Sequence, residues 1–185
     1  MILPIYIYGN PVLKQVAEPI DPDYEGLDEL INNMWETMYN AKGVGLAAPQ
    51  VGRSIRLFIV DTVQIEGEEN PHDGIKRVFI NAVKIDEDGA EWPYEEGCLS
   101  IPDVRGDVER PQRLKLRYMD ENFVEHEEVF DEINARVVQH EYDHIEGVLF
   151  TEKLKPIKKR RVRRRLEQMK QGKVEADYAV RFYRS

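Results

Sequence analysis

The sequence contains one cysteine and no long apolar run. Because Cys98 is the only cysteine among 185 residues, an internal disulfide is impossible. No apolar stretch approaches the roughly 20 residues with which a helix crosses a bilayer. These two absences argue against a disulfide-stapled secreted domain and against a protein with membrane-spanning helices.

The N-terminal segment also lacks the features of a secretion signal. "MILPIYIYGN" is apolar, but it has no basic lead and no small-residue cleavage site, and Pro4 interrupts it. The chain contains no Asn-x-Ser/Thr glycosylation sequon. We therefore expect a cytoplasmic protein with no membrane partner, and the length favours one domain over residues 1–185.

The net charge of −9 conceals an uneven distribution along the chain. Residues 153–185 contain 13 lysines and arginines against three acidic residues, whereas residues 1–152 contain 13 against 32. A basic C-terminal helix and tail on an acidic body indicate contact with an anionic surface.

The spacing of apolar residues predicts helices near both ends of the chain and strands between them. A helix is expected to open at Asp21 and Pro22 and to end near Gly43, and another to follow Asp131 and stop at Gly147. Strand-like runs lie at 55–62, 77–85, 113–120 and 122–130. This order predicts an α+β fold, with mostly antiparallel β-sheets packed around the central helix, an N-terminal helix and a basic C-terminal helix.

The stretch "QHEYDHIEG", residues 139–147, indicates a metal site. Residues four apart on a helix point the same way, so His140 and His144 present two imidazoles to one point, with Glu141 beside them. This is the H-E-x-x-H pattern of zinc hydrolases, in which the histidines bind the metal and the glutamate acts as a base. The alternative is a pair of histidines that are hydrogen-bonded in the core, with Glu141 in solvent.

A catalytic metal site needs a third protein ligand, and the familiar positions do not supply one. Six residues past the second histidine stands Phe150, which cannot ligate a metal, and Glu167 lies among arginines whose charge opposes a cation. His72 and His126 remain, but each lies in a polar, loop-like or strand-edge setting. Elimination favours Cys98, whose thiolate is a strong ligand for divalent iron or zinc.

Three separated segments resemble the signature motifs of bacterial peptide deformylase. They are "GVGLAAPQ" at 43–50, "EGCLS" at 96–100 and "QHEYDHIEG" at 139–147, in the order and spacing of that family. The resemblance extends from near residue 3 to about residue 165. Ile145 is a conservative departure, because the family more often has leucine there.

The resemblance implies a metallohydrolase that removes the N-formyl group from formyl-methionyl nascent chains and releases formate. The two motif histidines and Cys98 would bind one divalent metal ion, natively ferrous iron, which zinc, nickel or cobalt can replace. Glu141 would act as the base. The Gln50 side-chain amide and the Leu99 backbone N–H would donate to the developing oxyanion.

The first motif also satisfies the dinucleotide fingerprint G-x-G-x-x-A. That interpretation requires a preceding strand and a following helix. The preceding segment instead has a helical pattern, and Pro49 lies where the new helix would run, so we reject nucleotide binding. The resemblance implies instead that the backbone of Val44 and Gly45 pairs with an extended substrate, as does that of Gly97.

Several side chains are candidates for neighbouring roles. Val44 and Val137 could form an apolar methionine pocket, although Val137 would serve equally well in the core. Arg105 matches a family arginine near the downstream end of the substrate, or it is a solvated loop charge. Asp143 faces away from the two histidines on the helix, and we expect a structural ion pair, with Arg110 as the suggested partner.

The C-terminal region allows more than one interpretation. In the family a C-terminal helix is implicated in ribosome binding, and eight basic residues between Lys155 and Arg165 fit that role. The alternative is a solvated amphipathic helix that packs through Ile157, Val162, Leu166 and Met169. The tail "DYAVRFYRS" could fold back or mediate an oligomer, and residues 63–76 are expected to form a long exposed loop.

Two other functions remain in competition at this point. A zinc endopeptidase would need a histidine or an acidic third ligand downstream, which is absent, and it would have no use for Gln50 or Cys98. A non-catalytic structural site is normally closed by four protein ligands, and a fourth candidate is not evident.

Overall fold

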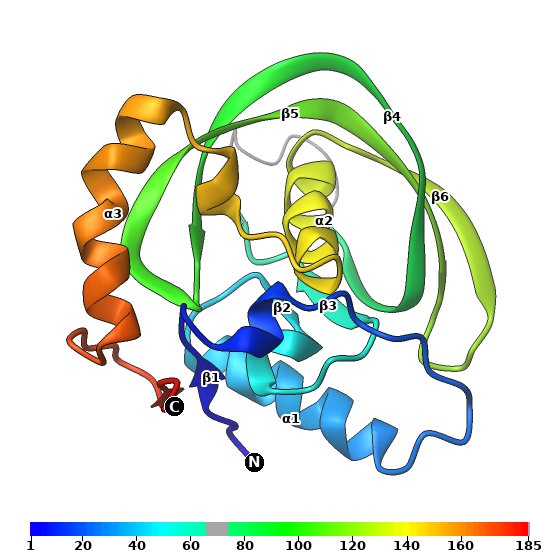
Figure 1. The fold of residues 1–185 in the computed structure, drawn as a ribbon. Helices are drawn as coiled ribbons and strands as arrows, with labels where there is room; N and C mark the ends of the chain where they lie inside the picture. The colour runs from blue at the N-terminus through cyan, green and yellow to red at the C-terminus, as the bar shows by residue number, and fades with distance from the viewer. Residues whose placement is uncertain (66–73, 185) are drawn as a thin grey trace.

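The computed structural model describes residues 1–65 and 74–184. The helix α2 (Glu132–Ile145) lies at the centre, and curved strands arch around it, while α1 (Leu27–Asn40) and α3 (Pro156–Lys170) flank this arrangement (Figure 1). Five strands form one antiparallel sheet in the order β2-β3-β4-β5-β6. Their bounds are Gly45–Ala47, Leu57–Asp61, Lys76–Cys98, Ile101–Met119 and Glu125–Asp131. The α+β prediction, with mostly antiparallel strands around a central helix, is confirmed.

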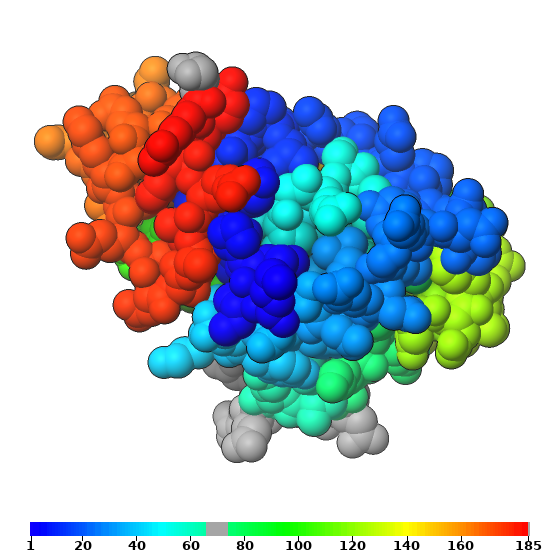
Figure 2. Space-filling model, turned by 90° about the horizontal axis from the view of Figure 1, so that it is seen from below, coloured from blue at the N-terminus to red at the C-terminus, as the bar shows by residue number. Residues whose placement is uncertain are grey.

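A second pair of strands joins the two ends of the chain. β1 (Ile5–Tyr6) pairs in parallel with β7 (Val180–Arg181). Figure 2 shows the red C-terminal segment beside the dark-blue N-terminal residues and against the orange α3. Of the two outcomes predicted for the tail, the structure therefore has the one in which it folds back.

The strands β4 and β5 are much longer than predicted. They contain 23 and 19 residues and form a hairpin that bends around α2, with irregularities in register between Ile80 and Val83 and again between Asp88 and Glu91. β-Bulges of this kind bend a strand and increase its twist. Much of β4 is charged and exposed, which is why its sequence lacks a clear strand pattern.

The central helix has the ends that the sequence predicted. Asp131 is its N-cap, and its carboxylate accepts a hydrogen bond from the Glu132 backbone N–H at 2.8 Å. Gly147 follows the last turn in the left-handed region, with φ of 73°. Nearly every side chain of α2 is buried, because the sheet covers it on several sides.

The first helix starts later than predicted, at Leu27 rather than at Asp21. The Asp21 carboxylate accepts a hydrogen bond from the Asp23 backbone N–H at 2.9 Å, and the Tyr24 N–H donates to the Asp21 carbonyl. Such local bonds stabilise a turn in competition with a helix. The apolar residues whose spacing predicted the helix are all buried, namely Leu27, Leu30, Ile31, Met34 and Met38.

The C-terminal helix packs through only part of its predicted apolar face. Val162 and Met169 are buried and Leu166 is half-buried, but Ile157 is 63% exposed, so the prediction for Ile157 is wrong. Ile157 lies in the first turn of α3, on the side of the helix that faces solvent. No helix in the described part of the chain is long and apolar enough to cross a membrane.

The predicted 63–76 loop lies partly outside the described residues, since 66–73 are not among them. Its base is closed by the Thr62 backbone N–H, which donates to the Ile75 carbonyl at 2.8 Å.

The glycine that ends α2 should be harder to replace than the equivalent glycine after α3. Gly147 and Gly172 both have positive φ, but an alanine Cβ at Gly147 would lie 2.7 Å from the Lys14 carbonyl oxygen, whereas one at Gly172 meets only Phe182 at 3.6 Å. Gly147→Ala should lower the free energy of unfolding by about 2–4 kcal/mol, and Gly172→Ala by about 1 kcal/mol. Urea unfolding of the two variants measures this difference, and equal losses would contradict the steric argument.

Candidate metal centre

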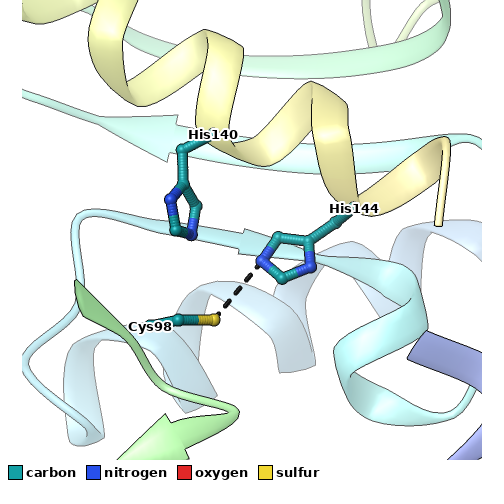
Figure 3. A group of neighbouring side chains, drawn as sticks. All are labelled: Cys98, His140 and His144. Carbon is teal, nitrogen blue, oxygen red and sulfur yellow. Dashed lines mark hydrogen bonds between the residues drawn. The ribbon is translucent and has the colours of Figure 1, made fainter. Parts of the chain in front are cut away.

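Three potential metal ligands converge where the tip of the β4–β5 hairpin meets α2. Cys98 comes from the end of β4, and His140 and His144 come from successive turns of α2 (Figure 3). Their ligand atoms all lie within 4.8 Å of one another. The Cys98 Sγ atom is 3.4 Å from the His144 Nε2 atom. The structure thus brings together the three residues that the sequence predicted as ligands.

The chemistry of these donors fits a divalent transition metal. One thiol sulfur and two imidazole nitrogens are ligands for iron, zinc, nickel or cobalt. The side chain of His144 is buried, and its Nδ1 atom has no hydrogen-bond partner within residues 1–65 and 74–184. No fourth cysteine, histidine or acidic residue joins the group within these ranges. Three protein ligands are the number found in catalytic sites, whereas structural sites normally have four.

A buried carboxylate orients one of the histidines. Oε1 of Glu96 lies 2.9 Å from Nδ1 of His140, and a neutral His140 that donates this proton keeps the lone pair of Nε2 for a metal. Arg110 donates to both carboxylate oxygens of Glu96, at 2.7 and 3.0 Å, and Arg136 donates to one of them at 2.7 Å. The side chains of all three charged residues are no more than 5% exposed. Glu96 therefore couples the ligand helix to the hairpin.

Asp143 completes this buried network. Its carboxylate accepts a hydrogen bond from Arg110 Nη1 at 2.8 Å, so the suggested ion pair is confirmed. The network then contains two arginines and two carboxylates, and their formal charges cancel. Pairing of opposite charges offsets the desolvation cost of burying them.

Burial and neighbouring groups shift the pKa values of the two histidines in opposite directions. Burial lowers the pKa of His144 well below its ordinary value, so this ring is neutral and available to a metal. Burial acts on His140 in the same direction, but hydrogen bonds with Cys98 and Glu96 outweigh it and raise its pKa. The pKa of Glu96 is held well below its usual range, because the hydrogen bonds from His140 and Arg110 outweigh the effect of burial. A cation bound to His140 would meet the same stabilising field.

Glu141 lies on α2 between the two histidines and faces the backbone of β2. An alanine Cβ at Gly45 would lie 2.5 Å from its Oε1 atom, so only glycine leaves room for this carboxylate. The other oxygen, Oε2, is buried and has no hydrogen-bond partner within the described chain. Burial raises the pKa of Glu141 to about 7, which suits a group that must accept and return a proton near neutral pH.

Gln50 lies against the cysteine ligand. Its Oε1 atom accepts a hydrogen bond from the Ala47 backbone N–H, which turns the amide nitrogen towards the hairpin. This Nε2 atom lies 3.1 Å from Ser100 Oγ and 3.4 Å from Cys98 Sγ. The side chain of Gln50 is 2% exposed, so it is not the surface amide that its sequence context alone would suggest.

A cleft of about 750 Å³ opens beside the three ligands. The remaining predicted site residues line it, namely Val44, Gly45, Gly97, Leu99, Arg105 and Val137. Val137 is also buried in the main core cluster, so its two predicted roles coincide. Arg105 lies at the rim in an exposed ion pair with Glu95, at 3.0 Å.

The rejected ligand candidates lie elsewhere. Phe150 is buried, and its ring centroid lies 6.0 Å from that of His140, so it packs against a ligand instead of being one. Glu167 is exposed on α3 and pairs with Lys170. His126 pairs with Asp120 at 2.7 Å. His72 is outside the described residues.

Sequence reasoning missed Glu96 and Tyr178, and it considered Arg136 only as a residue at the lip of a pocket. Glu96 stands in the second motif without an assigned role, and Arg136 lies four residues before His140 on the same face of α2. A charged residue on the buried face of an amphipathic helix was the available signal. Tyr178 has no such signal, because its tail reaches the cleft only through the tertiary fold.

The comparisons with known proteins agree with this geometry. The sequence model of the polypeptide deformylase family matches residues 2–160. The peptide deformylase of Christiangramia forsetii is 51% identical over 98% of this chain and 96% of its own length. That of Flavobacterium johnsoniae is 53% identical with the same coverage.

Solved structures show the same relationship in three dimensions. The crystal structure of a peptide deformylase from Legionella pneumophila superimposes with a TM-score of 0.80 at 36% identity, covering 92% of this chain and 96% of its own. That of the Thermus thermophilus enzyme has a TM-score of 0.80 at 37% identity, covering 91% and 97%.

The buried Glu96 should matter far more to stability and metal affinity than its exposed neighbour. Glu96→Gln removes the anionic partner of Arg136 and one of the two anionic partners of Arg110, and it should lower the free energy of unfolding by about 3–5 kcal/mol at pH 7. It should also weaken metal binding by about 10–100-fold, because His140 loses its carboxylate partner. Urea unfolding of the metal-free protein and titration with Co²⁺ measure the two effects.

The matched control is Glu95→Gln, which removes an exposed ion pair with Arg105 and should cost no more than about 1 kcal/mol. The folded-state pKa of Glu96 is depressed, so its stabilising effect is present at neutral pH and is lost as the pH falls below about 4. Equal losses for the two variants at pH 7 would contradict the role given to Glu96.

Proposed function

Because this chain belongs to the polypeptide deformylase family, whose members remove the N-formyl group from newly made peptides, we propose that Cys98, His140 and His144 hold its metal ion. The observation that carries this proposal is the convergence of the three ligand atoms beside the carboxylate of Glu141. The reaction is the hydrolysis of a formamide. The oxygen of water bonds to the formyl carbon, the carbon–nitrogen bond breaks, and formate and a free amine are released.

The metal ion would be held by the thiolate of Cys98 and the imidazoles of His140 and His144. When bound, it supplies a Lewis acid that polarises the formyl carbonyl and lowers the pKa of water. These donors suit iron, zinc, nickel and cobalt. Ferrous iron is our choice for the native metal, because the resemblance of the three motifs implies it. The metal content of protein purified without oxygen tests this choice.

Glu141 is the base in this proposal. Its carboxylate is buried beside the ligands, and its pKa of about 7 allows it to take a proton from water and to return it to the leaving amine. Gly45 permits this placement, because any larger residue would push the carboxylate away. A single side chain can thus serve both proton transfers of the reaction.

Gln50 and Leu99 are the proposed donors to the oxyanion. The amide nitrogen of Gln50 lies within 3.4 Å of the Cys98 sulfur, and Leu99 follows that ligand directly. Both donors are therefore held close to the position of the reacting carbonyl. Donors that are preorganised in this way stabilise developing negative charge and cost no reorganisation during the reaction.

The substrate binds as an extended strand in this proposal. β2 is an edge strand of the five-stranded sheet, and its residue Gly45 lines the cleft together with Val44. Gly97, at the end of β4, lines the same cleft. Pairing with backbone groups gives affinity without sequence specificity, which suits an enzyme that acts on many nascent chains.

An apolar pocket for the methionine side chain lies beside α2. Val44, Val137 and Ile133 line the cleft near the ligand helix, and Ile133 lies one helical turn before Val137. Arg105 is assigned to the downstream end of the substrate, at the exposed rim. We propose that residues 1–185 form one catalytic domain, because β2, the hairpin, α2 and the tail all contribute to one cleft. We also propose that it acts in the cytoplasm, as the sequence predicts.

Removal of the base should abolish most of the activity without removing the metal. Glu141→Gln should lower kcat for release of formate from a formyl-methionyl peptide by about 10²–10⁴-fold. Metal content and metal-titration curves should stay close to those of the wild type, because the three ligands are intact. Coupled assay of formate with anaerobically loaded protein is the measurement.

The control for this variant is Glu146→Gln, which lies at the end of the same helix and pairs with Arg56 away from the cleft. It should retain wild-type kcat. If the wild type binds one metal ion and yet cleaves no formylated peptide, the metal assignment survives and the proposed function is wrong.

We also propose that α3 contacts the ribosome. Of the eight basic residues between Lys155 and Arg165, only Arg165 has an acidic partner in the described part of the chain, Asp103 at 3.0 Å. Lys158 is half-buried against Gly106, and the remaining six are exposed and give the helix a positively charged surface. Ribosomal RNA presents phosphates, with which lysines and arginines interact in a salt-dependent way.

Neutralising part of this surface should weaken binding to ribosomes and leave the chemistry unchanged. A triple substitution of Arg160, Arg163 and Arg164 by glutamine should reduce affinity by about tenfold or more and should lower the log–log salt slope by roughly 2–3. Cosedimentation at several salt concentrations measures both. The matched control carries the same substitution at three exposed basic residues of β5, Arg113, Lys115 and Arg117. An equal loss in the control would show that only net charge matters.

A further inference from the structure

The segment that follows α3 reaches the cleft from the far end of the chain. We name residues 171–184 the C-terminal return. Glu175, Ala176, Asp177 and Tyr178 of this segment line the cleft together with residues of α2. The family sequence model ends at residue 160, so the signature motifs do not account for this wall.

The C-terminal return is anchored at several points. Val174 is buried in the same core cluster as residues of α3 and the hairpin. The Ile5 and Ile7 backbone N–H groups donate to the carbonyls of Ala179 and Arg181, at 2.9 and 3.0 Å. The buried side chain of Asn10 donates a further hydrogen bond to the Arg181 carbonyl at 3.0 Å. These bonds hold the intervening residues, including Tyr178, in a defined position.

The phenol of Tyr178 contacts the backbone next to a metal ligand. Its hydroxyl donates a hydrogen bond to the Leu99 carbonyl at 2.7 Å. Leu99 and Ser100 form the two-residue turn between β4 and β5, so their peptide groups lie outside the ladder of the hairpin. The Ser100 carbonyl accepts from the Tyr8 backbone N–H at 2.8 Å, and the Ser100 hydroxyl lies 3.1 Å from Gln50 Nε2.

These contacts have a geometric consequence for the Leu99 N–H. The N–H and C=O groups of Leu99 belong to two rigid peptide planes that meet at one Cα atom. The hydrogen bond from Tyr178 fixes the carbonyl plane and with it the Leu99 Cα, while the hairpin ladder holds the Cys98 Cα opposite Ile101. The Cys98–Leu99 peptide plane lies between these two fixed atoms, so its orientation is restricted. We propose that Tyr178 is a positioning residue that holds the Cys98–Leu99 peptide in its productive orientation. This inference rests on the proposed function, in which Leu99 donates to the oxyanion.

The substitution Tyr178→Phe removes the hydroxyl and keeps the ring. We expect kcat for a formyl-methionyl peptide to fall about fivefold, the rate equivalent of one hydrogen bond, with KM unchanged within about twofold. The reason is that a displaced oxyanion donor costs more in the transition state than in the bound substrate. Tyr183→Phe is the control, because Tyr183 lies on the same segment with its side chain 47% exposed, and its kcat should match that of the wild type.

A second measurement is independent of activity. Hydrogen exchange of the metal-free protein should be faster in Tyr178→Phe for the peptide that covers residues 95–101, and unchanged for peptides from α2. Thermal unfolding of each variant sets an assay temperature at which all are fully folded, so that kcat refers to folded enzyme.

The outcomes separate this inference from the proposed function. If the wild type releases formate and Tyr178→Phe matches it in kcat and in exchange, Tyr178 does not position the turn. A lower melting temperature with an unchanged kcat would likewise overturn the inference, because the role would then be structural only. If the wild type itself releases no formate, the proposed function is wrong, and the inference about kcat is wrong with it.

Discussion

The buried carboxylate of Glu96 is the interaction on which the rest of the structure depends. It accepts hydrogen bonds from Arg110 of β5 and from Arg136 and His140 of α2, so three elements meet at one side chain. Separating one member from such a network leaves an uncompensated charge in the interior, which is strongly destabilising. The same contacts set the tautomer of a metal ligand. Stability and the orientation of the ligand are therefore linked through a single residue.

The site is assembled from segments that approach from different directions. α2 supplies His140, Glu141 and His144, and the tip of the β4–β5 hairpin supplies Cys98. The bulged hairpin has to bend around the helix for the sulfur to reach the histidines. Because most side chains of α2 are buried against the sheet, packing prevents the helix from rotating about its axis. Its two imidazoles are thus presented rigidly, as catalysis that relies on preorganised groups requires.

The close approach of backbone and side chain at Gly45 connects the base with substrate binding. The Glu141 carboxylate occupies the space where a side chain at Gly45 would lie, while the edge of β2 faces the cleft. A formylated peptide that adds to this edge would bring its N-terminal end next to both the base and the ligands. The C-terminal return lines the same cleft, and β1 at the N-terminal end pairs with this segment without lining the cleft itself.

The sequence by itself determined the central helix, its caps, the three motif segments and the identity of the candidate ligands. These features depend on local spacing, such as the four-residue separation of His140 and His144, or on residue chemistry that few alternatives share. It did not predict the full length of β4 and β5, the buried partners of Glu96, the exposure of Ile157 or the contact between Tyr178 and Leu99. Those features join residues that lie far apart in the chain, and their geometry follows from bulges, burial and packing. Only the tertiary structure could decide them, because local sequence patterns do not predict which residues far apart in the chain come into contact.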